Sequence, residues 1–164
     1  MQIRFDENIS ADGHNPEYKM LTNETKYRVI YGDTDNMGVA YHANYLRWFE
    51  IGRTELIRSW GVTYKEIEAR GVFLPVSEAY CKFVTPARYD DVLIIETTLD
   101  ITLRAGMKFD YRVLNEKFSA ALALGYTKHA CLNGEGRVVR PPRFLKNMIE
   151  NNSPKLEREL LPES

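Results

Sequence analysis

Residues 44–60 read NYLRWFEIGRTELIRSW, and this stretch decides the architecture that the sequence predicts. Its apolar residues recur three and four positions apart, which places them on one face of an amphipathic helix. Gly61 stands where a helix end favours glycine. We therefore expect a long helix with a broad apolar face that must be buried, formed by Tyr45, Leu46, Trp48, Phe49, Leu56, Ile57 and Trp60.

The chain on both sides of this helix has the pattern of β-strands. Residues 26–31 alternate polar and apolar side chains before the helix, and the segments after it are rich in β-branched and aromatic residues. The expected strands cover 26–31, 72–83, 92–103, 107–114 and 120–132, with short helices at 64–70 and 144–149. One early helix followed by sequential antiparallel strands is an α+β pattern, in which the sheet wraps around the helix.

Composition limits the classes to which the protein can belong. A length of 164 residues fits one domain, and 44% hydrophobic with 27% charged residues is typical of a globular protein. The net charge of -1 predicts no nucleic-acid partner, because that function usually needs a strong positive field. No apolar run approaches the roughly 18–20 residues of a membrane span, and the N-terminus has no apolar signal region. We expect a cytoplasmic protein that does not insert into membranes.

The sequence also predicts how the chain is divided. Residues 1–22 are polar and turn-rich and form an expected N-terminal extension, residues 23–149 form the domain, and residues 150–164 form an expected flexible C-terminal tail. Cys81 and Cys131 fall in expected strands and outside any CxxC pair. Buried free thiols are the favoured interpretation, with a disulfide or a catalytic cysteine as the alternatives.

The loop before the helix holds the candidate chemistry. Residues 31–45 read YGDTDNMGVAYHANY and bring two acids, a histidine, two asparagines and several tyrosines to a helix N-terminus. Unpaired backbone N–H groups there can hold a developing oxyanion, and a nearby carboxylate can act as nucleophile or general base. On residue type alone, Asp33 and Asp35 also fit turn hydrogen bonds, and His42 fits a packed core histidine.

Three motifs together carry a family resemblance. Residues 31–45 fit the pattern Y-x-D-T-D-x-x-G-V-x-Y-H-x-N-Y, residues 49–55 fit F-E-x-x-R-T-E, and residues 85–91 read TPARYDD. They resemble the 4-hydroxybenzoyl-CoA thioesterase family, nearest its branch of bacterial acyl-CoA thioesterases linked to the Tol–Pal envelope system. The resemblance covers about residues 24–148.

The resemblance implies a fold, an assembly and a set of catalytic residues. The family has the hotdog fold, a long helix wrapped by an antiparallel sheet, and its subunits pair edge to edge as homodimers that usually join into homotetramers. The catalytic carboxylate of the family maps to Asp35, and its tyrosine and histidine map to Tyr31 and His42. A backbone N–H near His42 would hold the thioester carbonyl. The resemblance implies no metal or organic cofactor. For Asp33 we expect a structural role.

The CoA phosphates need basic groups, and the sequence offers several. The substrate-binding candidates are Arg88, Arg137 and Arg140, together with Asn44, which could instead hold the loop or cap the helix. Residues 137–143 form the densest basic cluster. A solvated surface is the competing interpretation for each of the basic residues, which also include Lys82, Arg104, Lys128 and Arg143.

The sequence therefore predicts an acyl-CoA thioesterase that releases a free acid and CoA, with Asp35 as nucleophile or general base. One alternative is a hotdog hydratase acting on enoyl-CoA. Another is a non-catalytic acyl-CoA-binding or regulatory protein, which would have no need of Tyr31, Asp35 and His42 together. The acyl group, and CoA or acyl carrier protein as its carrier, stay open.

Overall fold

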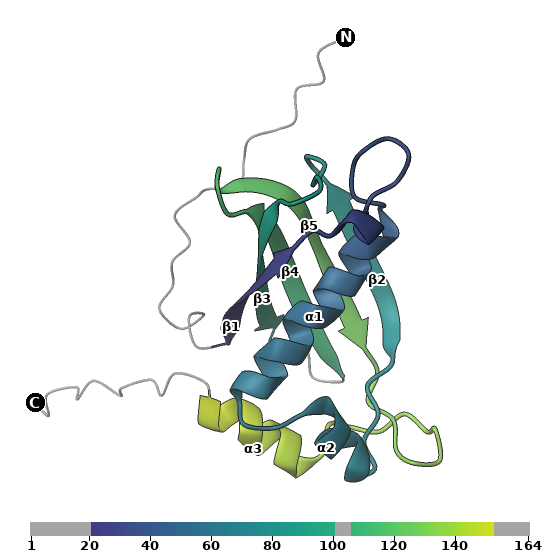
Figure 1. Cartoon of the computed structure of the whole chain (residues 1–164). Coiled ribbons are helices and arrows are strands. Elements are labelled where there is room, and N and C mark those ends of the chain that lie inside the picture. The colour runs from purple at the N-terminus through teal and green to yellow at the C-terminus, as the bar shows by residue number, and fades with distance from the viewer. Residues whose placement is uncertain (1–20, 101–105, 153–164) are drawn as a thin grey trace, which may run out of the picture.

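The computed structural model describes residues 21–100 and 106–152, and it contains a sheet, a long helix and two shorter helices (Figure 1). The helices are α1 (Ala43–Ser59), α2 (Tyr64–Ala69) and α3 (Arg143–Asn152). The strands are β1 (Thr22–Arg28), β2 (Val76–Phe83), β3 (Val92–Asp100), β4 (Met107–Asn115) and β5 (Ala120–His129). A short 3₁₀ turn, Tyr31–Asp33, lies between β1 and α1.

The sheet has the order β1-β3-β4-β5-β2, and every neighbouring pair is antiparallel. Helix α1 lies across one face of the sheet, and α2 and α3 gather near its C-terminal end (Figure 1). Strands β3 and β4 alternate buried and partly exposed residues, since one face of each strand meets α1. This arrangement confirms the predicted α+β hotdog fold.

Glycines at two positions let α1 approach the sheet closely. A side chain on Gly52 of α1 would place its Cβ 2.8 Å from Ile95 Cγ2 of β3, and one on Gly125 of β5 would meet the Phe49 ring at 2.7 Å. Phe49 instead stacks flat on Tyr111 of β4, with ring centroids 4.2 Å apart. Trp48, Phe49 and Ile57 have no exposed surface and form part of the core, as predicted for this helix face. Leu46, which was expected on the same buried face, is 43% exposed, so the prediction was wrong for that residue.

The N-terminal strand begins and ends earlier than the sequence predicts. β1 covers Thr22–Arg28, whereas residues 26–31 were expected, because the chain turns at Tyr31 into the 3₁₀ turn. Leu21 is already buried, and α3 continues to Asn152. The division of the chain near residues 22 and 150 stays a prediction.

Among the remaining strands, β2 starts later than expected, and β5 ends at His129, before the expected residue 132. β2 begins at Val76, not at residue 72, because residues 72–75 lead out of α2 and Phe73 makes a single bridge to Leu132. β3 is described as far as Asp100, so residues 101–103 of the expected strand lie outside the described residues. A capping box at Thr63 and Glu66 opens α2.

Both cysteines are free thiols, as favoured from the sequence. Cys131 is buried in the core, and Cys81 is half-buried on β2. Burial raises the pKa of Cys81 to about 11 and also raises the pKa of Cys131. Because the thiolate is the reactive form, neither residue is suited to nucleophilic catalysis.

A chain of buried hydrogen bonds crosses the core between β4, β5 and the segment before β2. Leu74 O accepts from His129 Nδ1 at 2.8 Å, so Nδ1 carries the proton and Nε2 is the acceptor. Thr127 Oγ1 then donates to Nε2 at 2.9 Å and accepts from the Tyr111 hydroxyl at 2.7 Å. The neutral imidazole thus fixes which atom is the donor in each of these three hydrogen bonds.

This histidine makes stability depend on pH. Burial lowers the pKa of His129 from 6.5 to about 4. Between these two pH values the imidazole is protonated in the unfolded chain and neutral in the folded chain. The free energy of unfolding therefore has its full value above pH 6.5 and falls by up to about 3 kcal/mol as the pH drops to 4. Urea unfolding at pH 7 and pH 4.5 should show this loss in the wild type and much less of it in His129→Asn. Equal losses in the two proteins would contradict the assignment.

Candidate active site

The loop between the 3₁₀ turn and α1 is a compact hairpin-like turn. Thr34 pairs with Ala40, Asp35 N donates to Val39 O at 2.9 Å, and Gly38 N donates to Asp35 O at 2.9 Å. Gly38 has a φ of 71°, a left-handed conformation that glycine adopts without strain. These bonds fix the backbone on both sides of Asp35 and set the position from which its side chain projects.

Asp35 keeps one oxygen available. Its Oδ1 accepts a hydrogen bond from Met37 N at 2.8 Å, and among the described residues its Oδ2 accepts none. The side chain is partly exposed. A carboxylate held by one oxygen and open at the other can attack an electrophile or take a proton from water.

Asp33, two residues earlier, has a structural position. It is 1% exposed and accepts from Tyr27 Oη at 2.8 Å, from Ile30 N at 3.0 Å and from the Arg47 guanidinium of α1. Arg47 also donates to Tyr27 Oη at 2.9 Å, which closes a three-residue cluster. Asp33 therefore ties the loop to both β1 and α1, in agreement with the structural role expected for it.

The start of α1 offers unpaired backbone donors. His42 is the N-cap residue, and no side chain caps the helix. Asn44 N donates to Tyr41 O at 2.9 Å, and Tyr41 N donates to Asp33 O at 2.8 Å. Within the described part of the chain, the N–H groups of His42 and Ala43 have no hydrogen-bond partner. Such donors, with the positive end of the helix dipole, suit a developing negative charge.

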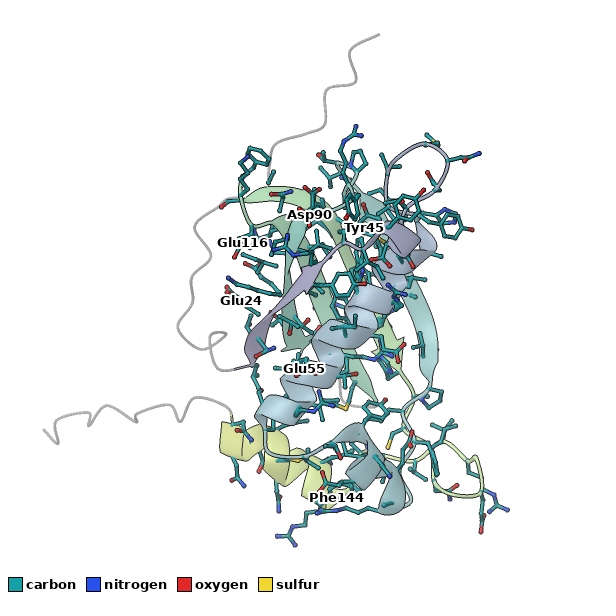
Figure 2. The ribbon with its side chains drawn as sticks, in the orientation of Figure 1. Glu24, Tyr45, Glu55, Asp90, Glu116 and Phe144 are labelled. Carbon is teal, nitrogen blue, oxygen red and sulfur yellow. The ribbon has the colours of Figure 1, made fainter. Side chains whose placement is uncertain are left out.

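A pocket of about 190 Å³ lies against this helix start. Its walls come from the helix start and from the segment that leaves β2 after Phe83, and they are mostly apolar: Ala40, His42, Tyr45, Phe83, Val84, Thr85 and Pro86. Figure 2 shows Tyr45 at this end of α1 and Phe144 at the opposite end of the molecule. The pocket, the unpaired N–H groups and the loop of Asp35 therefore lie at the same end of the molecule, around the start of α1.

The structure does not gather all of the predicted catalytic residues within one chain. His42 lines the pocket, whereas Asp35 and Tyr31 do not. Tyr31 is 81% exposed, with its ring 6.2 Å from that of Tyr89. No hydrogen bond joins Asp35, His42 and Tyr31 to one another in the described residues.

Two of the substrate-binding candidates lie close to the loop. Asn44 Nδ2 donates to Asp33 O at 2.8 Å, so its amide supports the loop, which was one of the two roles expected from the sequence. Arg88 directly follows Ala87, the residue after the pocket wall, and its side chain is exposed. Its backbone N–H donates to Asp91 Oδ2 at 2.8 Å, which leaves the guanidinium to reach into solvent.

Arg137 and Arg140 lie far from this loop in the same chain. Both stand between β5 and α3, where Val139 N donates to Cys131 O and Leu132 pairs with Phe73. That connection lies at the α2 and α3 end of the molecule (Figure 1). Arg137 is exposed and pairs with Glu135 at 3.4 Å. One chain alone therefore does not bring these two arginines to Asp35.

Sequence reasoning missed several residues that build the site. Tyr27 and Arg47 hold Asp33, yet they stand six residues before it and fourteen after it, outside any local motif. Phe83 forms a pocket wall from the end of β2. The sequence signal for Arg47 was its place on the polar face of the helix, which is also typical of an ordinary solvated arginine.

Within residues 21–100 and 106–152, no group of three or more His, Cys, Asp or Glu side chains is placed to hold a metal ion. None of the helices in these ranges is both long and apolar enough to cross a bilayer.

Comparison with known proteins places this geometry in a family. The model of the thioesterase-like superfamily matches residues 29–151. Acyl-CoA thioesterase YbgC of Haemophilus influenzae is 32% identical over 121 residues, which are 73% of this chain and 88% of the relative.

Solved structures agree with the fold. A protein of Thermus thermophilus superposes with a TM-score of 0.73 at 35% identity, covering 78% of this chain and 97% of its own. A 4-hydroxybenzoyl-CoA thioesterase, solved with 4-hydroxybenzoyl-CoA, superposes with a TM-score of 0.70 at 20% identity, covering 78% of this chain and 98% of its own, and so shows the shared fold.

An antiparallel sheet around one long helix, with an acidic loop at the helix start, defines a hotdog enzyme of the acyl-thioester type. The chain belongs to the thioesterase-like superfamily, which confirms the family that the sequence motifs suggested.

Proposed function

We propose that this protein hydrolyses acyl-CoA thioesters to a free acid and CoA. The observation that carries the proposal is the meeting of three parts at one end of α1. These are a carboxylate with a free oxygen at Asp35, unpaired N–H groups at His42 and Ala43, and an apolar pocket beside them. The names of the relatives, which include acyl-CoA thioesterases, support the same reaction.

In the proposed reaction, the acyl group enters the pocket and the thioester carbonyl oxygen accepts from the N–H groups at the helix start. These donors stabilise the negative charge that develops on that oxygen. As a nucleophile, Asp35 adds to the carbonyl carbon, the C–S bond breaks, and water then hydrolyses the mixed anhydride. As a general base, Asp35 takes a proton from water while the oxygen of that water adds to the carbon.

Either route releases CoA as a thiolate, which must take up a proton. His42 lines the pocket and is exposed, so it is placed to supply that proton or to orient water. Tyr31 would position the substrate at the solvent side, and Arg88 would meet a CoA phosphate as a charge-assisted partner. We also propose the cytoplasmic location that the sequence predicts.

The proposed assembly is a homodimer formed along β2, which can pair further into a tetramer. β2 is an edge of the sheet and is exposed along almost its whole length, including the apolar side chains of Val76, Tyr80 and Phe83. An uncovered apolar edge strand readily pairs with another strand, and a second copy supplies an identical one. Such a partner could also bring its own Arg137 and Arg140 towards the loop of Asp35.

The assembly gives a direct prediction for the wild type and two variants. Size-exclusion chromatography with light scattering should give a dimer or tetramer for the wild type and a shift towards monomer for Tyr80→Asp, which puts a charge in the middle of β2. Phe118→Asp, at an exposed apolar residue of the β4–β5 turn, should keep the wild-type mass. A monomeric wild type would contradict the β2 interface.

The reaction is tested by thiol release from a panel of acyl-CoA thioesters with the purified wild type. Release that depends on enzyme concentration and yields the matching free acid supports hydrolysis. Tight binding of acyl-CoA without release would replace the proposal with the binding-protein alternative. Consumption of an enoyl-CoA without thiol release would replace it with the hydratase.

A further inference from the structure

We propose that Tyr45 is the specificity-determining residue of this site, because its ring forms a fixed floor that limits the enzyme to compact acyl groups. The inference rests on the proposed function and adds to it the class of acyl group. Compact means a short aliphatic chain or one ring beyond the thioester carbonyl.

The pocket has two facing walls. One is the start of α1, with Ala40 and His42, and the other is the segment from Phe83 to Pro86. The two walls are held together below the pocket, where Ala40 N donates to Ala87 O at 2.8 Å. An acyl group that enters beside His42 therefore passes between the two walls.

Tyr45 lies one turn into the helix, between these walls. It is 2% exposed, and its hydroxyl accepts a buried hydrogen bond from Ala87 N at 3.0 Å, which ties its ring to the opposite wall. Phe83 meets the ring edge-on at 5.0 Å, and Trp48 packs behind it at 4.6 Å. A ring held at its tip and on two sides does not swing away, so it ends the pocket.

The size of the pocket sets the size of the ligand. Its volume is about 190 Å³. Sites for drug-sized ligands have about 300–1,000 Å³, so this pocket is small and suits a compact acyl group. A longer chain would have to displace Tyr45 or leave its end in water. Each methylene in a hydrophobic site changes selectivity by roughly 10-fold or more, so the limit should be steep.

The experiment measures kcat/KM for butanoyl-, hexanoyl-, benzoyl-, dodecanoyl- and hexadecanoyl-CoA. The wild type should prefer the first three over the last two by at least roughly 10-fold. In Tyr45→Leu, which removes the ring, the ratio of dodecanoyl to hexanoyl activity should rise at least roughly 10-fold. In Tyr45→Phe, which keeps the ring and removes only the hydroxyl, the preference for compact groups should persist.

The outcomes separate this inference from the proposed function. No thiol release by the wild type from any thioester would overturn the proposed function. Release with dodecanoyl- or hexadecanoyl-CoA preferred would overturn only the compact limit. An unchanged ratio in a folded Tyr45→Leu, judged by circular dichroism, would overturn the role of Tyr45.

A second variant keeps the inference testable if Tyr45→Leu does not fold. Phe83 is 51% exposed, so Phe83→Ala removes little packing within one chain but takes away the side support of the Tyr45 ring. Because Phe83 also lies on the proposed β2 interface, the comparison uses Phe83→Ala only at the oligomeric mass of the wild type. The ratio of dodecanoyl to hexanoyl activity should again rise several-fold. A ratio equal to that of the wild type would overturn a pocket bounded by these two rings.

Discussion

Asp35→Asn should lose at least roughly 100-fold in kcat while the protein keeps its fold and its oligomeric mass. The amide can still accept from Met37 N through its oxygen, as Asp35 Oδ1 does at 2.8 Å, so the loop keeps its geometry. What the amide lacks is the negative charge and the basicity that attack on a carbonyl or on water requires. Thiol release from a thioester that the wild type cleaves is the measurement.

A matched control uses another acid at the same end of the molecule. Asp90 lies in the turn between β2 and β3 (Figure 2), is exposed, and pairs with Arg28 at 3.0 Å. Its φ is 68°, a left-handed conformation that asparagine tolerates well, so Asp90→Asn removes a charge without strain. This control should keep kcat close to the wild-type value. Similar rates in Asp35→Asn and Asp90→Asn would remove Asp35 from the reaction.

The two routes open to Asp35 give different labels. If the carboxylate is the nucleophile, one turnover in ¹⁸O-labelled water can leave ¹⁸O in the side chain of Asp35, because water opens the anhydride at either carbonyl. If the carboxylate acts as a general base, the label enters only the released acid. Mass spectrometry of the protein after a single turnover distinguishes the two.

The fold was predictable because its main signals are local. The stripe of Trp48, Phe49, Leu56 and Ile57 predicts a helix with one buried face, and strands with short turns after it leave few ways to cover that face. Strand limits were less predictable. Tyr31 has the side chain of a strand residue, but β1 ends at Arg28 and Tyr31 begins the 3₁₀ turn.

The site was predictable only where its residues are neighbours in sequence. The loop of Asp35 and the helix start at His42 form one continuous motif, so residue types and spacing were enough to select them. The hydrogen bond from Ala87 N to the Tyr45 hydroxyl joins residues 42 positions apart, and the ion pair of Asp33 with Arg47 crosses from loop to helix. Nothing in the local pattern separates these residues from ordinary core or surface positions.

For the basic residues, a local sequence pattern suggested a contribution to the site that the fold of one chain does not provide. Arg137 and Arg140 were selected because charge is dense between residues 137 and 143, and density is a local property. Their distance from Asp35 depends on which end of the sheet the β5–α3 connection occupies, which is set by the direction of β5, antiparallel to β4 and β2. In the sequence, nothing distinguishes Arg88 from an ordinary surface arginine, yet in the structure it lies beside the pocket wall.

Asp33→Ala should have the largest effect on stability, a loss of about 3 kcal/mol in the free energy of unfolding. The carboxylate is buried and accepts from Tyr27, Ile30 N and Arg47, so its removal leaves three donors without their partner. The expected value is at the lower end for a buried ion pair because the Arg47 side chain is half exposed and can return to water. Urea unfolding at neutral pH measures the loss.

A double-mutant cycle with Arg47→Ala separates the ion pair from the other contacts. Arg47→Ala leaves the Asp33 charge buried and unpaired, so the two single losses should exceed the loss in the double variant by roughly 1–3 kcal/mol. The exposed pair of Arg28 and Asp90 is the matched control, with a coupling below about 0.5 kcal/mol. Equal couplings for the two pairs would show that Asp33 does not hold the loop through Arg47.

The same variant connects stability to catalysis. The backbone carbonyl of Asp33 accepts from Tyr41 N and from Asn44 Nδ2, both at 2.8 Å, so the carboxylate cluster and the helix start share one short segment. At a temperature where Asp33→Ala is still folded, its kcat should fall because Asp35 and the N–H groups of His42 and Ala43 lose their fixed relation. Tyr27→Phe, which removes one hydrogen bond and no charge, should reduce kcat less. A folded Asp33→Ala with the kcat of the wild type would make the cluster a stabilising contact with no part in positioning Asp35.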